Sequence, residues 1–274
     1  MSLPILPSHR AATTADLVRL YQRTELQWVR QAAEETPLEC GSAFTNPLLP
    51  KIYDSNCMLQ ASIPEGSTAA AAVAEADAFF TSRGARCFKW MLNTAVPPPR
   101  TQPLAEHLLS LGFTAETYDL MYLGGRPTRA IDEAAGLQII PGRASFRHAR
   151  ELFQESAARW NEPQVVEAAM LHVEDPQTDS LLALKDGSAA GLVLVLIDGE
   201  LGCIEDLYVA ERFRRQGVGR TLMSRALEIC ARSLLKHVFV NVDPTNAPAA
   251  ALYERCGFRR LAPYVLHRAP QARP

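Results

Sequence analysis

The chain has 274 residues, 47% of them hydrophobic, which is enough apolar material for one large core or two ordinary ones. Two domains are the better expectation at this length. The net charge of −2, with acidic and basic residues interspersed, gives no basic surface for nucleic acid. The longest apolar run, residues 189–197, is about half of what a membrane span requires, and the first residues lack a signal-peptide pattern. We expect a cytoplasmic protein, monomer or homodimer, without nucleic-acid or membrane partners.

In the first half, the hydrophobic pattern predicts a strand–helix–strand unit followed by another helix. Residues 57–60 and 87–92 are expected to be strands, with a helix over residues 68–82 between them. A further helix is expected over residues 104–111, after a proline-rich loop that begins at Val96. Gly124-Gly125-Arg126-Pro127 marks the start of a linker to the second half.

The second half is predicted to be an α/β (α+β) domain with a mixed, mostly antiparallel central sheet flanked by helices. Apolar residues recur at helical spacing over residues 146–160. Strands follow at residues 181–184, 192–197 and 201–209, and the turn signals between them predict an antiparallel meander. A helix over residues 221–235 leads to a strand over residues 238–242. Because a helix connects it to the strand before, this strand should pair in parallel with residues 201–209.

Residues 214–219 read Arg-Arg-Gln-Gly-Val-Gly and lie between a predicted strand and a predicted helix. The first N–H groups of a helix have no intrahelical partner and carry partial positive charge, so they bind phosphate well. Gly217 and Gly219 let the backbone approach a ligand, while Arg214, Arg215 and Arg220 add charge. The loop lacks the endings of nucleoside-triphosphate and dinucleotide loops. It therefore predicts a pyrophosphate site of another kind.

This loop, the preceding residues 205–209 and the later Asn246, Tyr253 and Gly257-Phe258 together resemble the GCN5-related N-acetyltransferase (GNAT) superfamily, over residues 137–268. The resemblance implies the acyl-CoA N-acyltransferase fold and acetyl-CoA as co-substrate, with no metal. It also implies that the loop binds pyrophosphate, that the strand before it binds the pantetheine arm and diverges from its neighbour, and that a tyrosine lies near the thiol. The implied acetyl-CoA residues are Leu207, Tyr208, Val209, Arg214, Arg215, Gln216, Gly217, Val218, Gly219, Arg220, Thr221 and Asn246.

The first half contains a faint repeat of the second. Aligning Gly112-Phe113 with Gly257-Phe258 also superposes Pro103 on Pro248, with the same offset of 145 residues. We predict a duplicated fold, with residues 1–130 a degenerate GNAT-like domain and residues 131–274 the GNAT domain; an unrelated helical cap is the alternative for the first half. No glycine loop precedes the helix over residues 68–82, and Leu108 stands in the place of Tyr253. The first half should therefore not bind acetyl-CoA.

Acetyl transfer to an amine needs a base for the ammonium proton and an acid for the departing thiolate. The resemblance makes Glu205 the candidate base and Tyr253 the candidate acid. Strand alternation puts Asp206 on the opposite face from Glu205 unless the strand is bulged, so Asp206 is either a substrate contact or a surface residue. Plainer alternatives are a solvated carboxylate at Glu205, a half-buried aromatic at Tyr253 and a helix cap at Asn246. A backbone amide near Val209 would hold the oxyanion.

The prediction is an N-acetyltransferase that moves the acetyl group of acetyl-CoA to a primary amine of a small molecule or peptide, by direct attack in a ternary complex. A non-catalytic acyl-CoA-binding sensor or subunit is the alternative, and transfer of a longer acyl group is a second one. If the two halves pack side by side, the acceptor site lies between them, and Trp160 and Asn161 would line it. The six cysteines show no Cys-x-x-Cys spacing, and most lie in apolar segments where a thiol acts as a small hydrophobic group, so neither a disulfide framework nor a zinc site is expected. The six histidines have no metal spacing to one another and are predicted to be structural or surface groups.

Overall fold

The computed structural model describes residues 12–124, 134–158 and 162–270. Trp160, Asn161 and the expected linker residues 125–127 lie outside these ranges. The first half contains these helices and strands: α1 (Thr14–Arg30), β1 (Glu34–Leu38), β2 (Gly41–Thr45), β3 (Cys57–Ala61), α2 (Ala69–Ser82), β4 (Lys89–Leu92), α3 (Gln102–Ser110) and β5 (Thr114–Gly124). The predicted strands and helices are confirmed as β3, α2, β4 and α3. The amphipathic helix α1, the hairpin β1–β2 and the long strand β5 were not predicted, and β5 includes Gly124, where a linker was expected to begin.

The second half contains these helices and strands: β6 (Leu137–Pro141), α4 (Phe146–Ala157), α5 (Gln164–Glu174), β7 (Thr178–Lys185), β8 (Ser188–Asp198), β9 (Leu201–Val209), α6 (Val218–Arg232), β10 (His237–Val242), α7 (Ala247–Arg255) and β11 (Arg259–Arg268). The antiparallel meander β7–β8–β9 and the parallel pair β9–β10 are both confirmed. Helix α5 was not predicted, because its apolar residues do not form a clear stripe.

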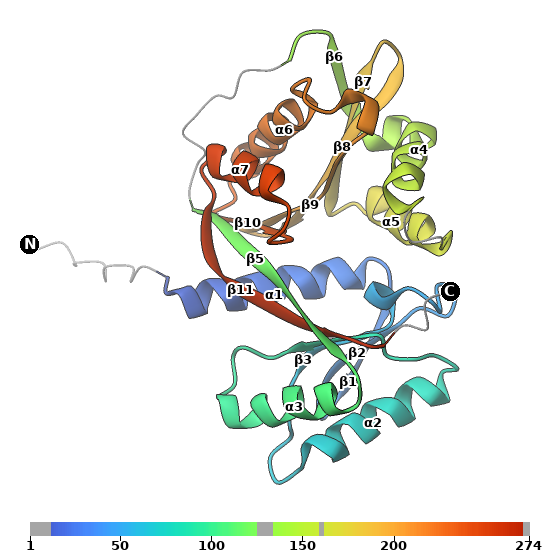
Figure 1. The fold of residues 1–274 in the computed structure, drawn as a ribbon, viewed down its shortest axis with the longest axis vertical. Helices are drawn as coiled ribbons and strands as arrows, with labels where there is room; N and C mark the ends of the chain where they lie inside the picture. The colour runs from blue at the N-terminus through green and yellow to red at the C-terminus, as the bar shows by residue number, and fades with distance from the viewer. Residues whose placement is uncertain (1–11, 125–133, 159–161, 271–274) are drawn as a thin grey trace, which may run out of the picture.

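Within the described ranges, eleven strands form one continuous sheet in the order β1-β2-β3-β4-β11-β5-β10-β9-β8-β7-β6. Figure 1 shows the two long strands β5 and β11 running between the two lobes of the molecule. Strand β5 pairs with β10 of the second half, whereas β11 pairs with β4 of the first half, and the two strands pair with each other. Each half therefore completes its part of the sheet with the last strand of the other. The division of the chain near residue 130 remains a prediction.

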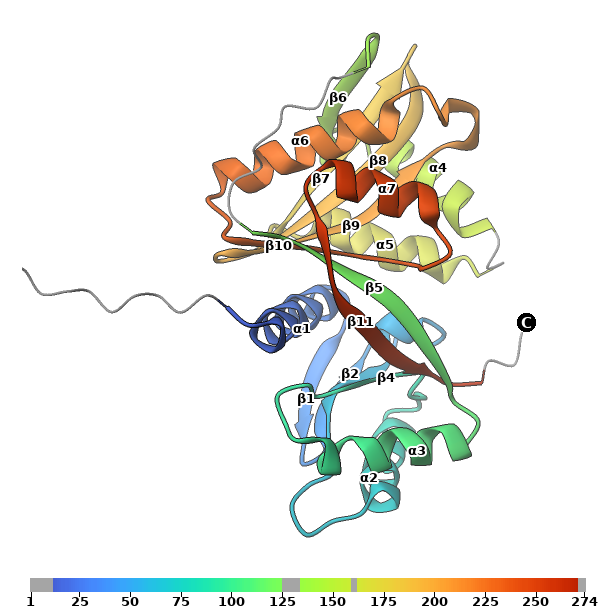
Figure 2. The same cartoon turned by 60° about the vertical axis from the view of Figure 1, so that its left-hand side comes forward.

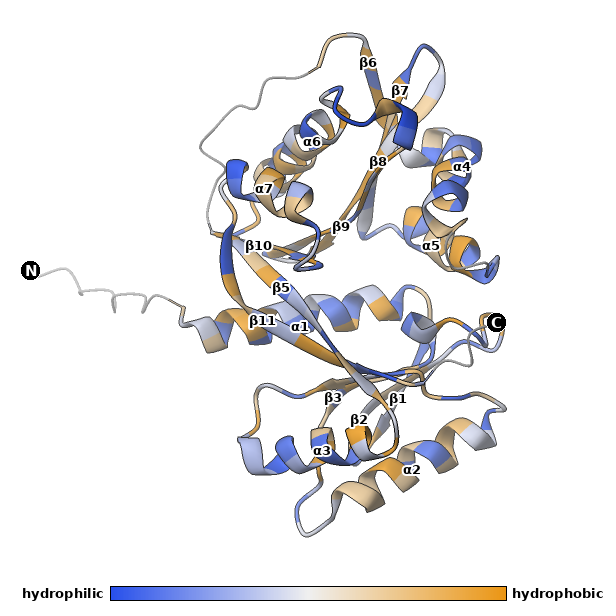
Figure 3. Ribbon diagram, in the orientation of Figure 1, coloured by the Kyte–Doolittle hydropathy of each residue, from blue (hydrophilic) through white to orange (hydrophobic). Residues whose placement is uncertain are grey.

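Helices cover both faces of the sheet (Figure 2). In the second half, α6 and α7 pack on one face through a cluster that includes Leu222, Leu227 and Phe258, and α4 and α5 pack on the other face. Strand β8 is hydrophobic along most of its length, as expected for a strand covered on both faces (Figure 3). Helix α1 packs against the middle of the sheet, with Tyr21 and Phe239 in a shared cluster.

Two local details repeat in both halves. Helices α3 and α7 end in the same hydrogen-bonded motif: Gly112 and Gly257 adopt positive φ, and the next N–H donates five residues back, to Leu108 O at 3.1 Å and to Tyr253 O at 3.0 Å. Strands β3 and β9 each contain a bulge whose central residue has positive φ, Gln60 at 52° and Asp206 at 49°. These repeats support the alignment that matched Gly112-Phe113 to Gly257-Phe258.

Candidate active site

Strands β9 and β10 run side by side for only part of their length. They pair from Leu201–His237 to Cys203–Phe239, although β10 continues to Val242 and β9 to Val209. On its other edge β9 stays paired with β8 as far as Val209. Beyond Cys203, the edge of β9 that faces β10 therefore has no strand partner among the described residues. This confirms the expected divergence of the two strands and places Leu207, Tyr208 and Val209 along it.

Helix α6 begins directly after Gly217, whose φ of 84° lies in the left-handed region that favours glycine. Thr221 is the first residue whose N–H bonds back into the helix, to Gly217 O at 3.0 Å. The amides of residues 218–220 consequently have no helical partner and carry the partial positive charge of the helix end. Three exposed arginines lie beside this end: Arg214, Arg215 and Arg220. The arrangement suits a pyrophosphate.

Several side chains of the loop stabilise the loop itself. The Arg214 guanidinium donates to Val209 O at 3.2 Å, and the Gln216 amide donates to Arg212 O at 2.9 Å. Thr221 is buried; its hydroxyl donates to Gly217 O and accepts from the N–H of Ala134. The backbone of the loop, rather than the side chains of Gln216 and Thr221, is therefore the part open to a ligand.

Glu205 and Asp206 face the same cavity. Strand alternation predicted opposite faces for them unless the strand is bulged, and the register of β9 against β8 shifts between Glu205 and Tyr208. Asp206 lies in this bulge with positive φ, which turns its side chain onto the side of Glu205. Asp206 lines the cavity and forms neither a hydrogen bond nor an ion pair with any described residue. The bulge thus places two adjacent carboxylates in one site.

The cavity lies between the two halves and has a volume of about 360 Å³. Helix α1, the segment before β3, and strands β4 and β5 line it from the first half, and α5, β9, β10 and β11 line it from the second half. A volume of this size suits a small molecule. Its ionisable side chains are Glu25, Asp54, Lys89, His172, Glu205, Asp206 and Arg268, together with four tyrosines, Tyr21, Tyr53, Tyr118 and Tyr264.

Burial and mutual repulsion alter the acidity of the cavity carboxyls. Burial, followed by the negative charge of Glu25, raises the pKa of Glu205 well above its usual value. Burial and the charge of Asp54 raise the pKa of Asp206 to about 6. Burial acts on Asp54 in the same direction, but the Lys89 ammonium at 2.5 Å outweighs it and lowers the pKa of Asp54. A carboxylate with a raised pKa is a stronger base, which is what a proton acceptor at Glu205 requires.

A hydrogen-bond network joins the two halves beside Glu205. The amide of Asn241 on β10 donates to the Tyr21 hydroxyl at 2.6 Å, and that hydroxyl donates to Glu25, both residues lying on α1. Glu205 accepts a hydrogen bond from the Cys203 thiol at 2.9 Å. Burial is the main reason that the pKa of Glu25 is raised. Glu25 therefore lines the cavity with Glu205 as a second carboxyl whose pKa is raised.

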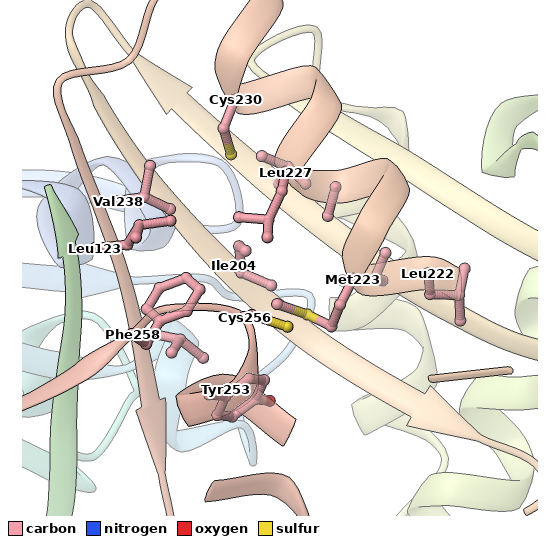
Figure 4. Close-up of a cluster of buried hydrophobic side chains, with 14 of the residues drawn as sticks. Leu123, Ile204, Leu222, Met223, Leu227, Cys230, Val238, Tyr253, Cys256 and Phe258 are labelled. Atoms are coloured by element: carbon pink, nitrogen blue, oxygen red, sulfur yellow. The ribbon is translucent and has the colours of Figure 1, made fainter. Parts of the chain in front are cut away.

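Tyr253 lies on α7, at the edge of the cluster under α6 (Figure 4). Its ring is buried and lies 6.1 Å from that of Phe258. Its hydroxyl makes no hydrogen bond with a described residue, and burial, followed by the charge of Glu205, raises its pKa. The phenol therefore stays protonated at neutral pH and keeps a proton to donate. Asn246 is exposed and accepts a hydrogen bond from Ala249 N–H at 3.3 Å as the N-cap of α7, in line with the plainer alternative.

Sequence reasoning placed the acceptor site between the halves if they pack side by side, but it identified none of the first-half residues that line the cavity. Two signals were available: Glu25 follows Leu17 and Tyr21 at helical spacing on the buried face of α1, and Lys89 interrupts the apolar strand β4. Such a buried charge requires a partner or a function. His172 was predicted to be structural or on the surface; it lies in the cavity wall, stacked on Trp28 with ring centroids 3.7 Å apart.

Residues 146–258 match the model of the Acetyltransferase (GNAT) family. These residues form a GNAT domain. The streptothricin acetyltransferase of Streptomyces lavendulae is 34% identical over 88 residues, which make up 31% of this chain and 47% of that relative, so the match spans about half of the relative's length. A solved GCN5-related N-acetyltransferase from Kribbella flavida superposes with a TM-score of 0.65 at 14% identity, covering 96% of this chain and 98% of that one.

The GNAT likeness extends over both halves. A tandem GNAT protein of the clavulanic acid biosynthesis pathway superposes with a TM-score of 0.53 at 13% identity, covering 94% of this chain and 96% of that one. At such identities the likeness concerns the fold, and it confirms the predicted duplication against the alternative of a helical cap. All six cysteines are free and buried, as expected. No helix in the described ranges is long and apolar enough to cross a membrane, and no metal-binding cluster occurs within them.

Proposed function

We propose that the protein is an N-acetyltransferase that transfers the acetyl group of acetyl-CoA to a primary amine. The observation that carries this proposal is the divergence of β9 from β10 between the free amides of α6 and a cavity that contains Glu205. In this arrangement one end of the gap suits a pyrophosphate, and the strands that border the gap carry the cavity residues Glu205, Asp206 and Asn241.

The donor would be held mainly by backbone groups. Residues 217–220 would bind the pyrophosphate of acetyl-CoA, with Arg214, Arg215 and Arg220 supplying charge. The free edge of β9 at residues 207–209 would bind the pantetheine arm. Gly219 supports this path, because a Cβ there would lie 3.4 Å from Val209 and 3.7 Å from Leu252, between β9 and α7.

The acceptor enters as an ammonium ion, which must lose a proton before its nitrogen can attack. Glu205 takes that proton, and its raised pKa makes the transfer easier. The nitrogen then forms a bond with the thioester carbonyl carbon, an amide N–H near Val209 stabilises the developing oxyanion, and the carbon–sulfur bond breaks. Tyr253 donates a proton to the departing thiolate and regains one from the attacking nitrogen, which must lose its second proton to become an amide, while Glu205 passes its proton to solvent. The products are an acetamide, free coenzyme A and one proton.

The test is amine-dependent release of the coenzyme A thiol from acetyl-CoA. Wild-type protein should release thiol with at least one primary amine. Glu205→Gln should still bind acetyl-CoA but should release thiol much more slowly. Binding of acetyl-CoA without turnover of any amine, across small amines and peptides with free N-termini, would favour the sensor alternative. Thiol release from succinyl-CoA but not from acetyl-CoA would show that the donor is a longer acyl-CoA.

A further inference from the structure

The cavity between the halves contains more negative charge than it neutralises. Four carboxyl side chains line it, two from each half: Glu25 and Asp54 from the first half, and Glu205 and Asp206 from the second. Its two cations are already paired: Lys89 lies 2.5 Å from Asp54, and Arg268 lies 2.8 Å from Glu116 and stacks over Tyr53. The remaining three carboxyls, Glu25, Glu205 and Asp206, have no ion pair with a described residue.

An uncompensated carboxyl cluster of this kind selects for positive charge. Burial, followed by repulsion between neighbouring carboxyls, raises the pKa values of Glu25, Glu205 and Asp206. A bound cation removes this repulsion. A ligand with its own carboxylate would be repelled, because the two cations of the cavity, Lys89 and Arg268, are already paired with Asp54 and Glu116.

A single amino group on the acceptor does not neutralise the negative charge of the carboxyl cluster throughout the reaction. The reacting ammonium gives up its proton at Glu205, so its positive charge is gone when the nitrogen attacks, while Asp206, which has no ion pair with a described residue, still faces the cavity. A second ammonium on the same molecule stays charged throughout the reaction. The aromatic rings of Tyr53, Tyr118 and Trp28 in the wall suit the apolar chain between the two groups and the charge itself.

We propose that the acceptor is a small aliphatic diamine, with the reacting nitrogen at Glu205 and the distal ammonium held by Asp206, beside the Asp54–Lys89 pair. This inference rests on the proposed acetyltransferase function and specifies the substrate class of the same site. It also assigns the first half a role: without a donor site of its own, it contributes Asp54 and Glu25 to the acceptor site.

The experiment compares three amines that share a four-carbon chain and differ only at the far end: putrescine, butylamine and γ-aminobutyrate. Thiol release at saturating acetyl-CoA should give putrescine a kcat/KM at least about tenfold above that of butylamine, the effect of one shielded ion pair. γ-Aminobutyrate should be the poorest of the three. Equal values for putrescine and butylamine, or a preference for γ-aminobutyrate, would overturn the inference.

Asp206→Asn tests the assigned residue. Asparagine tolerates the positive φ of this position, so the bulge should be kept. The variant should lose most of the preference for putrescine over butylamine, mainly through a higher KM for putrescine. Asp179→Asn, an exposed carboxylate on β7 outside the cavity, is the control. An unchanged putrescine preference in Asp206→Asn would contradict the assignment.

The same assay separates this inference from the acetyltransferase proposal. Turnover of an alanyl peptide through its free N-terminus, without turnover of putrescine, would overturn the diamine and keep acetyl transfer. Absence of thiol release with every amine would overturn both.

Discussion

The two halves have the same strand–helix–strand unit, but the two parallel strands diverge only in the second half. In the second half, β9 and β10 stop pairing after Cys203–Phe239. In the first half, β3 and β4 pair at Cys57–Lys89 and Met58–Trp90, and beyond the bulge they pair again at Ala61–Leu92. Asn93 N–H closes that end with a 2.9 Å bond to Ala61 O. The space in which a pantetheine arm would lie is therefore absent from the first half.

The N-terminus of the helix that follows the bulged strand also differs between the halves. In the first half the Thr68 side chain caps α2 by accepting from Ala71 N–H, whereas Gly217 before α6 has no side chain that can cap the helix. When the bulge residues Gln60 and Asp206 are aligned, Leu59 takes the place of Glu205. Leu59 is an apolar residue buried in the core, so the first half has no carboxylate at this position. Leu108, which aligns with Tyr253, has no hydroxyl that could donate a proton. Both halves have the same fold, while the proposed base, acid and donor loop all belong to the second half.

The largest expected effect is loss of the base. Glu205→Gln should lower kcat/KM by about 10³-fold, within the range for general acid–base groups, because the amide cannot accept the ammonium proton. Affinity for acetyl-CoA should stay within about twofold, since the donor contacts lie elsewhere on β9 and α6. Glu200→Gln, in the exposed turn before β9, is the matched control. If Glu205→Gln keeps activity near the wild-type level, Glu205 is not the base, and the account is contradicted.

Removal of the phenol should have the next largest effect. Tyr253→Phe should lower kcat by about 10²-fold, because the thiolate then leaves without a proton donor. The ring remains in its cluster beside Phe258, so stability should change little. Steady-state kinetics with acetyl-CoA and the best amine measure the effect. If kcat is unchanged, Tyr253 is a core residue, as Leu108 is in the first half.

The donor loop gives a third comparison. Gly219→Val places a side chain between Val209 and Leu252 and should weaken acetyl-CoA binding by about tenfold or more, without the strain that positive φ would cause. Gly217 is a poorer test, because φ is 84° and a Cβ would lie 2.9 Å from Ala134. Ala70→Val, at the matching second residue of α2, is the control and should not affect binding. Calorimetric titration of both variants decides the point.

The smallest effect concerns the contact between the halves. Burial lowers the pKa of His172 to about 3, and the histidine stacks on Trp28 of α1. Because the folded-state pKa is depressed, the unfolded chain takes up the proton first, and stability falls as the pH drops below about 6.5. His172 should account for a loss of about 2 kcal/mol in the free energy of unfolding between pH 7 and pH 5. Urea denaturation of wild type, His172→Gln and the control His148→Gln measures it; equal pH dependence in all three would contradict the buried, neutral state.

Sequence reasoning worked where the signal is local. The glycine loop, the antiparallel meander and the helix that ends at Gly257 follow from turn and periodicity rules over a few residues. It did not predict that β11 pairs with β4 and β5, because strand pairing over long sequence separations depends on tertiary packing. The bulge at Asp206 was left open for the same reason, since alternation gives no signal for an inserted residue. The cavity combines Glu25 with Glu205, which are distant in sequence, and only the fold brings them together.

The central claim is that one half binds the donor and the other does not. Calorimetric titration of the purified protein with acetyl-CoA tests it most directly, because it gives the number of sites per chain as well as the affinity. The account predicts one site per chain, with binding weakened in Gly219→Val and unchanged in Ala70→Val. Two sites per chain, or one site that responds to Ala70→Val instead, would contradict it.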